Sequence, residues 1–369
     1  MLRSSAWPAS ARSVDADGVE DSARVAAGSW RRGSAPSDRL ASVPAVAATA
    51  PLLSAGTAGG SFAALAAVAA ADVALARAVE PHLDALAILA QAGATAPEGS
   101  TWGVFAAEAP GLRLTATAEG AGAGGTGPVG AGSVGTGSGG SVLLHGTKPW
   151  CSLASVLSHA LVTAHVGEDR QLFAVDLRQD GVTVHDEAWV ARGMPDVPSG
   201  PVDFAGVRAT PVGEPGWYTA RPGFAWGGIG VAACWWGGAV GLARLLRDRA
   251  AEHRGSELLQ VALGATVADL ADAEDALADA AARIDDPGPD ATTDREWVLL
   301  AQVVRSRVRR SVDAVRERVV RTLGPAPLTA DASVAARVAD LELYVLQDHG
   351  DRDLARIGRI VVEDGGVAW

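Results

Sequence analysis

The feature that most constrains the fold is a series of long helical patterns in the C-terminal part of the chain. Apolar residues recur there at helical spacing in four successive segments. These segments are 229–252, 256–284, 293–323 and 332–362. Gly255, the turn Asp286-Pro287-Gly288-Pro289 and the pair Gly324-Pro325 separate them. A helix of roughly 28 residues spans about 42 Å, so we predict an antiparallel four-helix bundle over residues 223–369.

The chain before this bundle divides into three predicted parts. Residues 1–58 are rich in Ala, Ser, Gly, Pro and Arg without a sustained period, which predicts a low-complexity leader or an eroded first helix. Residues 59–113 form a predicted N-terminal helical domain, in which Pro81 divides the helical pattern into two and Gly93 ends it. Residues 114–222 form a predicted middle β domain, because short strand-like runs alternate there with Gly, Asp and Pro.

The middle domain combines strand-like runs with one segment that cannot form a core. The runs are 142–144, 160–164, 172–177, 182–185 and 202–204. Their short spacing predicts antiparallel strands, whereas glycine alternates with small residues over 120–140, which predicts a flexible loop. The predicted fold class is therefore α+β and mainly helical, with N-terminal helices, a middle antiparallel β domain and a C-terminal four-helix bundle. Clefts between such units are where ligands bind.

Charge and composition exclude several classes of protein. The chain carries 31 basic and 43 acidic residues, a formal net charge of -12, which would repel a nucleic-acid backbone. Cys151, Cys234 and the histidines show no disulfide framework and no metal-ligand spacing. The apolar stretch 223–243 is interrupted by repeated glycines, so we predict no membrane span. No secretory signal pattern is recognisable near the N-terminus, and we expect a cytoplasmic protein.

A short segment within the middle domain resembles a known family. The residues Gly146-Thr-Lys-Pro-Trp-Cys-Ser152 are similar to the N-G-x-K-x-W-I-T segment of acyl-CoA dehydrogenases. Further similarities lie in Arg192–Phe204, in the small-residue run Gly237–Ala243 and in the turn Leu323-Gly324. The resemblance covers residues 61–362. It implies an FAD-dependent oxidoreductase that removes an α-proton from an acyl-CoA or related thioester while hydride passes to the flavin, which an electron acceptor then reoxidises.

The resemblance assigns the first flavin contacts to Trp150, Cys151 and Ser152. An indole offers a flat apolar face, and a hydroxyl can bond the edge of the flavin ring. The alternative interpretation of the same residues is structural. Trp150 would then be a core anchor, Ser152 a polar residue at a strand end, and Cys151 a reduced packing cysteine.

A second group of flavin contacts is implied in the bundle. There the family binds the flavin's pyrophosphate and adenine across a subunit interface, and the corresponding residues are Arg249, Arg321, Leu323 and Gly324. Arginine is a good partner for phosphate. The resemblance therefore implies a homodimer or homotetramer, whereas solvent-exposed arginines on amphipathic helices are the alternative interpretation.

The catalytic base implied by the resemblance is Asp348, which lies eight residues after Asp340. A carboxylate beside an apolar cleft can act as a general base near neutral pH. Asp is one methylene shorter than the Glu usual in the family, and His349 is a rival base or the mark of a different reaction. A third interpretation is a charged turn between helices, in which Asp348 caps the following helix.

One departure from the family pattern keeps other functions open. The family's T-E-P-x-x-G-S-D loop, which helps to hold flavin and substrate, is replaced by Leu114–Glu119 and the glycine-rich segment. One alternative is a flavin-dependent monooxygenase of the same architecture, in which His349 assists the reaction. The other is a catalytically silent structural subunit that pairs with an active homologue.

Overall fold

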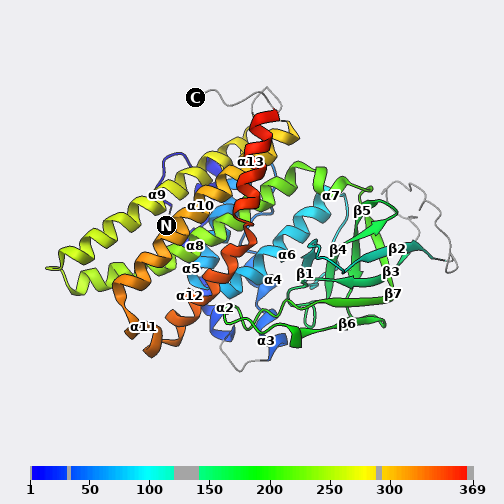
Figure 1. Ribbon diagram of the computed structural model, residues 1–369, viewed down its shortest axis with the longest axis horizontal. Helices are drawn as coiled ribbons and strands as arrows, with labels where there is room; N and C mark the ends of the chain where they lie inside the picture. The colour runs from blue at the N-terminus through cyan, green and yellow to red at the C-terminus, as the bar shows by residue number, and fades with distance from the viewer. Residues whose placement is uncertain (1, 31–34, 120–140, 288–292, 364–369) are drawn as a thin grey trace.

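Helices and strands occupy opposite sides of the molecule (Figure 1). The computed structural model describes residues 2–30, 35–119, 141–287 and 293–363. Long helices pack along one another, and α6 (Val73–Gln91) lies between them and the strands. The elements follow the predicted order of helices, strands and helices. The predicted loop 120–140 lies outside the described residues.

The prediction of a low-complexity leader over residues 1–58 was wrong for the described part of that segment. Trp7 is 2% exposed and Val43 is fully buried, and the Trp7 indole nitrogen donates to Glu274 Oε1 at 2.9 Å. The apolar residues are distributed over several short helices, so no single period revealed them. These helices are α1 (Ala9–Arg12), α2 (Ala16–Ala27), η1 (Gly28–Trp30), α3 (Pro36–Leu40) and α4 (Val43–Ala47).

The break between the next two helices falls at Asp72 and not, as predicted, at Pro81. Asp72 separates α5 (Ala58–Ala71) from α6, and its carboxylate accepts a hydrogen bond from Leu75 N at 2.8 Å. This is a standard N-terminal cap. Pro81 lies inside α6, which continues to Gln91.

The central helix α8 (Pro222–Glu252) packs closely on α5 through small residues. All 14 residues of α5 are buried, and a Cβ at Gly237 of α8 would lie only 2.1 Å from the Ala66 carbonyl oxygen of α5. Only glycine permits this approach. By length and composition α8 could cross a membrane, but 72% of its most apolar part is buried inside the fold, as expected of a core helix.

The strands form one mixed sheet, whereas a purely antiparallel one was predicted. The pairings β4–β2, β2–β3, β3–β7, β7–β5 and β5–β4 close a ring, in which β2 is parallel to β4. β1 is also parallel to β4, and it comes from the segment predicted to be the helical domain. The strands are β1 (Trp102–Phe105), β2 (Leu114–Ala118), β3 (Val142–Lys148), β4 (His159–Val166), β5 (Asp169–Asp176), β6 (Val182–Val184) and β7 (Val202–Val212), with η2 (Asp186–Ala188) before β7.

Three of the four predicted bundle helices are continuous, and the fourth is broken. Thr293 and Glu296 form a reciprocal capping box that starts α10. The predicted helix 332–362 is interrupted at residues 345–350, where the chain turns before the last helix. The elements of this region are α7 (Trp217–Ala220), α9 (Glu257–Asp285), α10 (Asp294–Leu323), α11 (Pro325–Ala330), α12 (Ala332–Tyr344), η3 (Val345–Gln347) and α13 (Asp351–Glu363).

Candidate functional site

The turn that follows β3 holds an unusual backbone conformation. Trp150 and Leu153 both have φ of 60°, and Met194 has φ of 48°. No other non-glycine residue in the described part of the chain has a positive φ. Cys151 N donates to Gly200 O at 3.0 Å and Leu153 N donates to Pro198 O at 2.7 Å, which fixes the turn. Such conformations cost free energy and cluster at functional segments.

This turn presents Trp150 and withdraws Cys151. The Trp150 side chain is 59% exposed and meets the Trp189 ring edge-on, with the two ring centroids 6.4 Å apart. The Cys151 side chain is fully buried, and burial raises the pKa of its thiol. The turn therefore leaves the indole of Trp150 free for a ligand, while the Cys151 side chain, predicted as a flavin contact, belongs to the core.

Ser152 connects this turn to helix α6. Its hydroxyl lies 2.7 Å from Ser199 Oγ and accepts a hydrogen bond from Arg77 Nη2 at 3.0 Å. Arg77 Nη1 lies 3.7 Å from Glu80 Oε2, and the Arg77 guanidinium lies 6.0 Å from the centroid of the Tyr344 ring. Arg77 thus joins the strand turn, the end of α12 and the carboxylate of Glu80.

Glu80 lines a cavity of about 300 Å³. Residues of α6, α7, α8, α10 and α13 surround the cavity. Its volume suits a small molecule. Its charged lining residues are Glu80, Asp84, Arg221, Arg305, Asp353 and Arg356.

Burial shifts the ionisation of the acidic residues in this cavity. Desolvation raises the pKa of Glu80 to about 7, despite the nearby charge of Arg77. Desolvation also raises the pKa of Asp84, although Arg221 opposes the shift. Perturbed carboxyl groups in a cavity are typical of functional sites.

Arg305 holds the opposite wall of the cavity in place. Its Nη1 donates to Gly228 O at 2.7 Å and its Nη2 donates to Gln347 O at 3.1 Å. Its guanidinium lies 4.6 Å from the centroid of the Trp235 ring. Arg305 therefore fastens the segment before His349 to the first turns of α8.

The two predicted catalytic residues have different surroundings. The Asp348 side chain is 4% exposed, and its Oδ1 accepts hydrogen bonds from Arg309 Nη1 at 3.0 Å and Gly350 N at 2.8 Å. Asp348 does not line the cavity, whereas His349 does. The His349 imidazole is 66% exposed, with Nδ1 3.6 Å from Asp353 Oδ2. The geometry thus favours His349 over Asp348 as the group that meets a ligand.

The residues predicted to bind the remote part of the flavin gather at the other end of α8. Arg249, Arg321 and Leu323 line an open cleft of about 620 Å³. Gly324, the fourth of these predicted contacts, ends α10 beside the cleft with φ of 71°. The cleft is about 30 Å from Gly228 along the helix axis, so it does not form one site with the cavity inside one chain.

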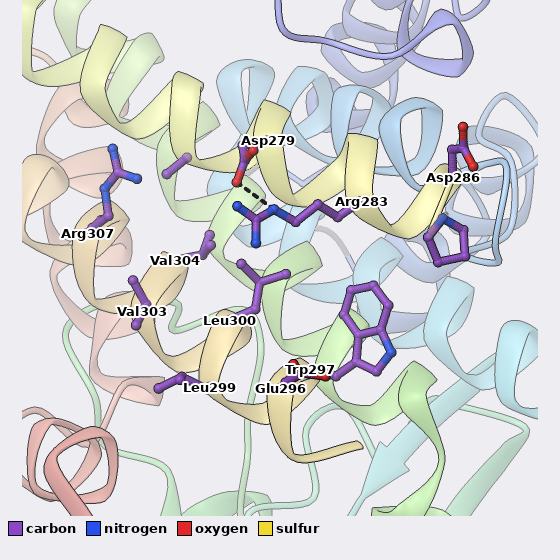
Figure 2. Close-up of a pocket in the computed structure, with 12 residues that line it drawn as sticks. Asp279, Arg283, Asp286, Glu296, Trp297, Leu299, Leu300, Val303, Val304 and Arg307 are labelled. Atoms are coloured by element: carbon purple, nitrogen blue, oxygen red, sulfur yellow. Dashed lines mark ion pairs between the residues drawn. The ribbon is translucent and has the colours of Figure 1, made fainter. Parts of the chain in front are cut away.

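Another open cavity, of about 630 Å³, lies between α9 and α10 (Figure 2). Trp297 and Leu300 point into it, and Arg283 pairs with Asp279 of its own helix at 3.0 Å. No residue predicted to be functional lines it. We therefore do not assign the site to this groove.

Sequence reasoning missed the polar residues of α6 that build the cavity. Arg77, Glu80 and Asp84 recur at spacings of three and four residues, so they share one face of an otherwise apolar helix. A row of charges on a helix that is mostly buried was the available signal. Apolar residues at helical spacing dominate this segment, so its pattern indicates a packing helix.

Comparison with solved structures supports the predicted fold. No protein-family model and no curated protein matches the sequence. The complex of TdsC from Paenibacillus sp. A11-2 with FMN and indole aligns with a TM-score of 0.73 at 18% identity, covering 93% of this chain and 95% of that one. KijD3 in complex with dTDP aligns with a TM-score of 0.69 at 17% identity, covering 94% and 97%. Methanesulfinate monooxygenase MsuC from Pseudomonas fluorescens aligns with a TM-score of 0.64 at 16% identity, covering 96% and 98%.

These similarities extend over nearly the whole chain and show the fold. The chain has the acyl-CoA dehydrogenase fold, as predicted, in the form found in TdsC, KijD3 and MsuC. TdsC is described as a dibenzothiophene monooxygenase, and MsuC as a methanesulfinate monooxygenase. At this level of identity the fold is shared, and the chemistry has to be argued from the site.

Proposed function

We propose that the protein is a flavin-dependent monooxygenase acting on a small molecule. The observation that carries the proposal is that His349 lines the cavity whereas Asp348 does not. Asp348 Oδ1 accepts hydrogen bonds from Arg309 and Gly350, and its Oδ2 is buried without a partner among the described residues. The resemblance to acyl-CoA dehydrogenases implies a carboxylate at that position that reaches the substrate, and Asp348 does not line the cavity. Proteins of the same fold include TdsC, which binds FMN and is described as a dibenzothiophene monooxygenase, and this supports the same reading.

The residues of the strand turn fit a flavin. The exposed Trp150 indole provides a flat apolar face, and the Ser152 hydroxyl, held by Arg77 and Ser199, provides a fixed polar group nearby. These two residues would hold the flavin ring. When bound, a reduced flavin supplies the two electrons that allow dioxygen to react, and FMN or FAD would serve equally in that role.

In the proposed reaction one oxygen atom of O₂ enters the substrate and the other leaves as water. The reaction also needs two electrons and two protons, and the reduced flavin would supply all four. Residues of α6, α8 and α10 line the cavity that would hold the substrate. His349 exchanges a proton with the reacting groups through Nε2, because its Nδ1 faces Asp353.

The proposal is tested by supplying chemically reduced FMN to the purified protein and following oxygen uptake over a panel of small substrates. Formation of an oxygenated product in proportion to oxygen consumed supports a monooxygenase. Anaerobic bleaching of bound flavin by an acyl-CoA thioester would instead establish the dehydrogenase reading. A protein that binds neither FMN nor FAD would indicate the silent structural subunit.

We further propose that the protein is a homo-oligomer whose partner copy covers the Arg249 cleft. Leu258 is 82% exposed and Val261 is 70% exposed on the α9 side of that cleft. Exposed apolar side chains that lie together mark contact surfaces. Sedimentation equilibrium tests this proposal, since a monomer at micromolar concentration would contradict it.

A further inference from the structure

The Ser152 hydroxyl belongs to a row of hydrogen bonds that runs through the strand turn. Arg77 Nη2 lies 3.0 Å from Ser152 Oγ, which in turn lies 2.7 Å from Ser199 Oγ. Ser199 Oγ lies 3.0 Å from the Val197 carbonyl oxygen. A hydroxyl donates one hydrogen and accepts through two lone pairs. The groups at the two ends of the row therefore decide which way the two hydroxyls point.

Both ends of the row have a fixed role. The Arg77 guanidinium can only donate, and the Val197 carbonyl can only accept. The single hydrogen of Ser199 therefore goes to Val197, and the hydrogen of Ser152 goes to Ser199. The reverse order would take this hydrogen bond from the carbonyl of Val197, a residue that is only 1% exposed, and an unmet buried carbonyl is costly.

The backbone on either side holds the two hydroxyls against each other. Cys151 N donates to Gly200 O, and Leu153 N donates to Pro198 O. These two bonds flank the pair of hydroxyls, and the positive φ of Leu153 belongs to the same turn. The orientation of the hydroxyls is thus built into the turn before any ligand binds.

The row leaves Ser152 with one function toward a ligand. Its only hydrogen is directed at Ser199, and one of its lone pairs accepts from Arg77. One lone pair remains, so Ser152 can accept a hydrogen bond from a ligand but cannot donate one. An oxidised flavin presents bare nitrogens at the edge of its ring, which accept hydrogen bonds. Two-electron reduction adds a hydrogen to one of these nitrogens and makes it a donor, so a hydrogen-bond partner at this edge distinguishes the two forms.

From this row we propose that Ser199 is a positioning residue: it fixes the Ser152 hydroxyl as an acceptor, so that the strand turn binds reduced flavin more tightly than oxidised flavin. This inference rests on the proposed function, because that proposal places the flavin ring at Ser152. The charge of Arg77, 3.0 Å behind the hydroxyl, acts in the same direction, since the reduced ring carries more negative charge at neutral pH than the oxidised ring.

The test compares the affinities of the full-length protein for the two redox forms of FMN. Anaerobic isothermal titration calorimetry measures the Kd of oxidised FMN and that of FMN reduced beforehand. We expect reduced FMN to bind about tenfold more tightly, because only this form gains the hydrogen bond to Ser152. The same preference places the midpoint potential of bound FMN about 30 mV above that of free FMN, which a dye-coupled redox titration measures independently.

Two variants separate a change of hydrogen-bond direction from a loss of structure. Ser152→Ala should weaken the binding of reduced FMN about fivefold and leave oxidised FMN unchanged, because only the reduced form donates to this hydroxyl. Ser199→Ala frees the Ser152 hydrogen to turn toward the ligand, so oxidised FMN should bind about threefold more tightly. Ser155→Ala, which alters an exposed serine of the same turn, should leave both affinities unchanged.

The binding readout keeps this inference distinct from the proposed function. Equal affinities for the two forms of FMN would overturn the inference even if the protein forms an oxygenated product, as would equal weakening of both forms in either serine variant. A preference for reduced FMN that depends on Ser152 and Ser199 supports the inference even if no product forms and the monooxygenase proposal fails. A protein that binds neither form overturns both.

Discussion

The two ends of helix α8 carry very different groups of charged residues. At its N-terminal end the cavity is built from five elements, and Arg305 there is tied to the backbone of Gly228 and Gln347. At its C-terminal end Arg249 pairs with Glu252 three residues away, and Arg321 pairs with Glu317 four residues away. The first group depends on the tertiary fold, and the second is satisfied within single helices.

This difference shows that residues identified by a motif, such as Arg249 and Arg321, can lie far from the cavity that the fold builds. An arginine that pairs within its own exposed helix contributes little to stability and is free to meet a partner or a phosphate. A buried charge bound to several elements fixes a shape. This difference is consistent with our proposal that the reaction takes place at the cavity and that the far cleft contacts another copy or the remote part of a flavin.

The largest effect is expected from removing Arg305. Arg305→Ala should lower the free energy of unfolding by about 3 kcal/mol or more, because two carbonyl oxygens and the face of Trp235 lose their partner in the core. Arg321→Ala, on the same helix but 72% exposed, should change it by less than about 0.5 kcal/mol. Urea unfolding measures both, and equal effects would remove the contrast between the two ends.

The next largest effect concerns whether His349 or Asp348 is the proton-transfer group. His349→Asn should reduce product formation about 100-fold with supplied reduced FMN, because a proton-transfer group is lost. Asp348→Asn should have a much smaller effect on turnover, since that carboxylate is bound to Arg309 and does not line the cavity. A larger loss in the Asp348 variant would restore it as the base.

A smaller effect is expected in the pH dependence of stability. The pKa of Glu80 is raised from 4.5 to about 7 by burial, so between these values the folded state binds more protons than the unfolded state, and stability falls as pH rises. Glu80→Gln removes this pH-dependent loss. Between about pH 5 and pH 8 the free energy of unfolding of the variant should rise by about 2 kcal/mol relative to that of the unsubstituted protein. The groups facing Glu80 are Arg77, Asp84, Tyr218, Cys234, Arg305 and Tyr344.

The measurement is thermal or urea unfolding of both proteins across that pH range. Comparing the variant with the unsubstituted protein isolates Glu80 from other buried groups. His82, for example, has its pKa lowered to about 4 by burial and acts in the opposite direction. A constant difference between the two proteins over the whole range would show that Glu80 keeps an ordinary pKa.

The long elements of the fold were predictable because their signals are local. Helix periodicity and the breaks at Gly255 and Gly324 fixed α8, α9 and α10 closely. The short helices of the first 58 residues were missed, because their burial depends on contacts with α5 and α9. A local period cannot report such contacts.

The candidate site was predictable only where a motif marked it. Trp150, Ser152 and His349 were identified through the resemblance, and the structure places them at the strand turn and at the cavity. Glu80 and Arg305 belong to no motif and become neighbours only when α6 and α10 pack. Their roles follow from burial and from contacts between elements, such as those of Arg305 with Gly228 and Gln347, which sequence alone does not give.

The smallest expected effect concerns which parts of the flavin bind near each end of α8. Trp150→Ala should weaken binding of both FMN and FAD about fivefold, since the loss of one aromatic contact is worth about 1 kcal/mol. Arg321→Ala should weaken FAD and leave FMN unchanged if the far cleft of a partner copy holds the adenine half. Fluorescence titration of each flavin measures these affinities. If the Arg321 variant binds both flavins normally, the far cleft has no part in cofactor binding, and the cavity with its strand turn is the whole site.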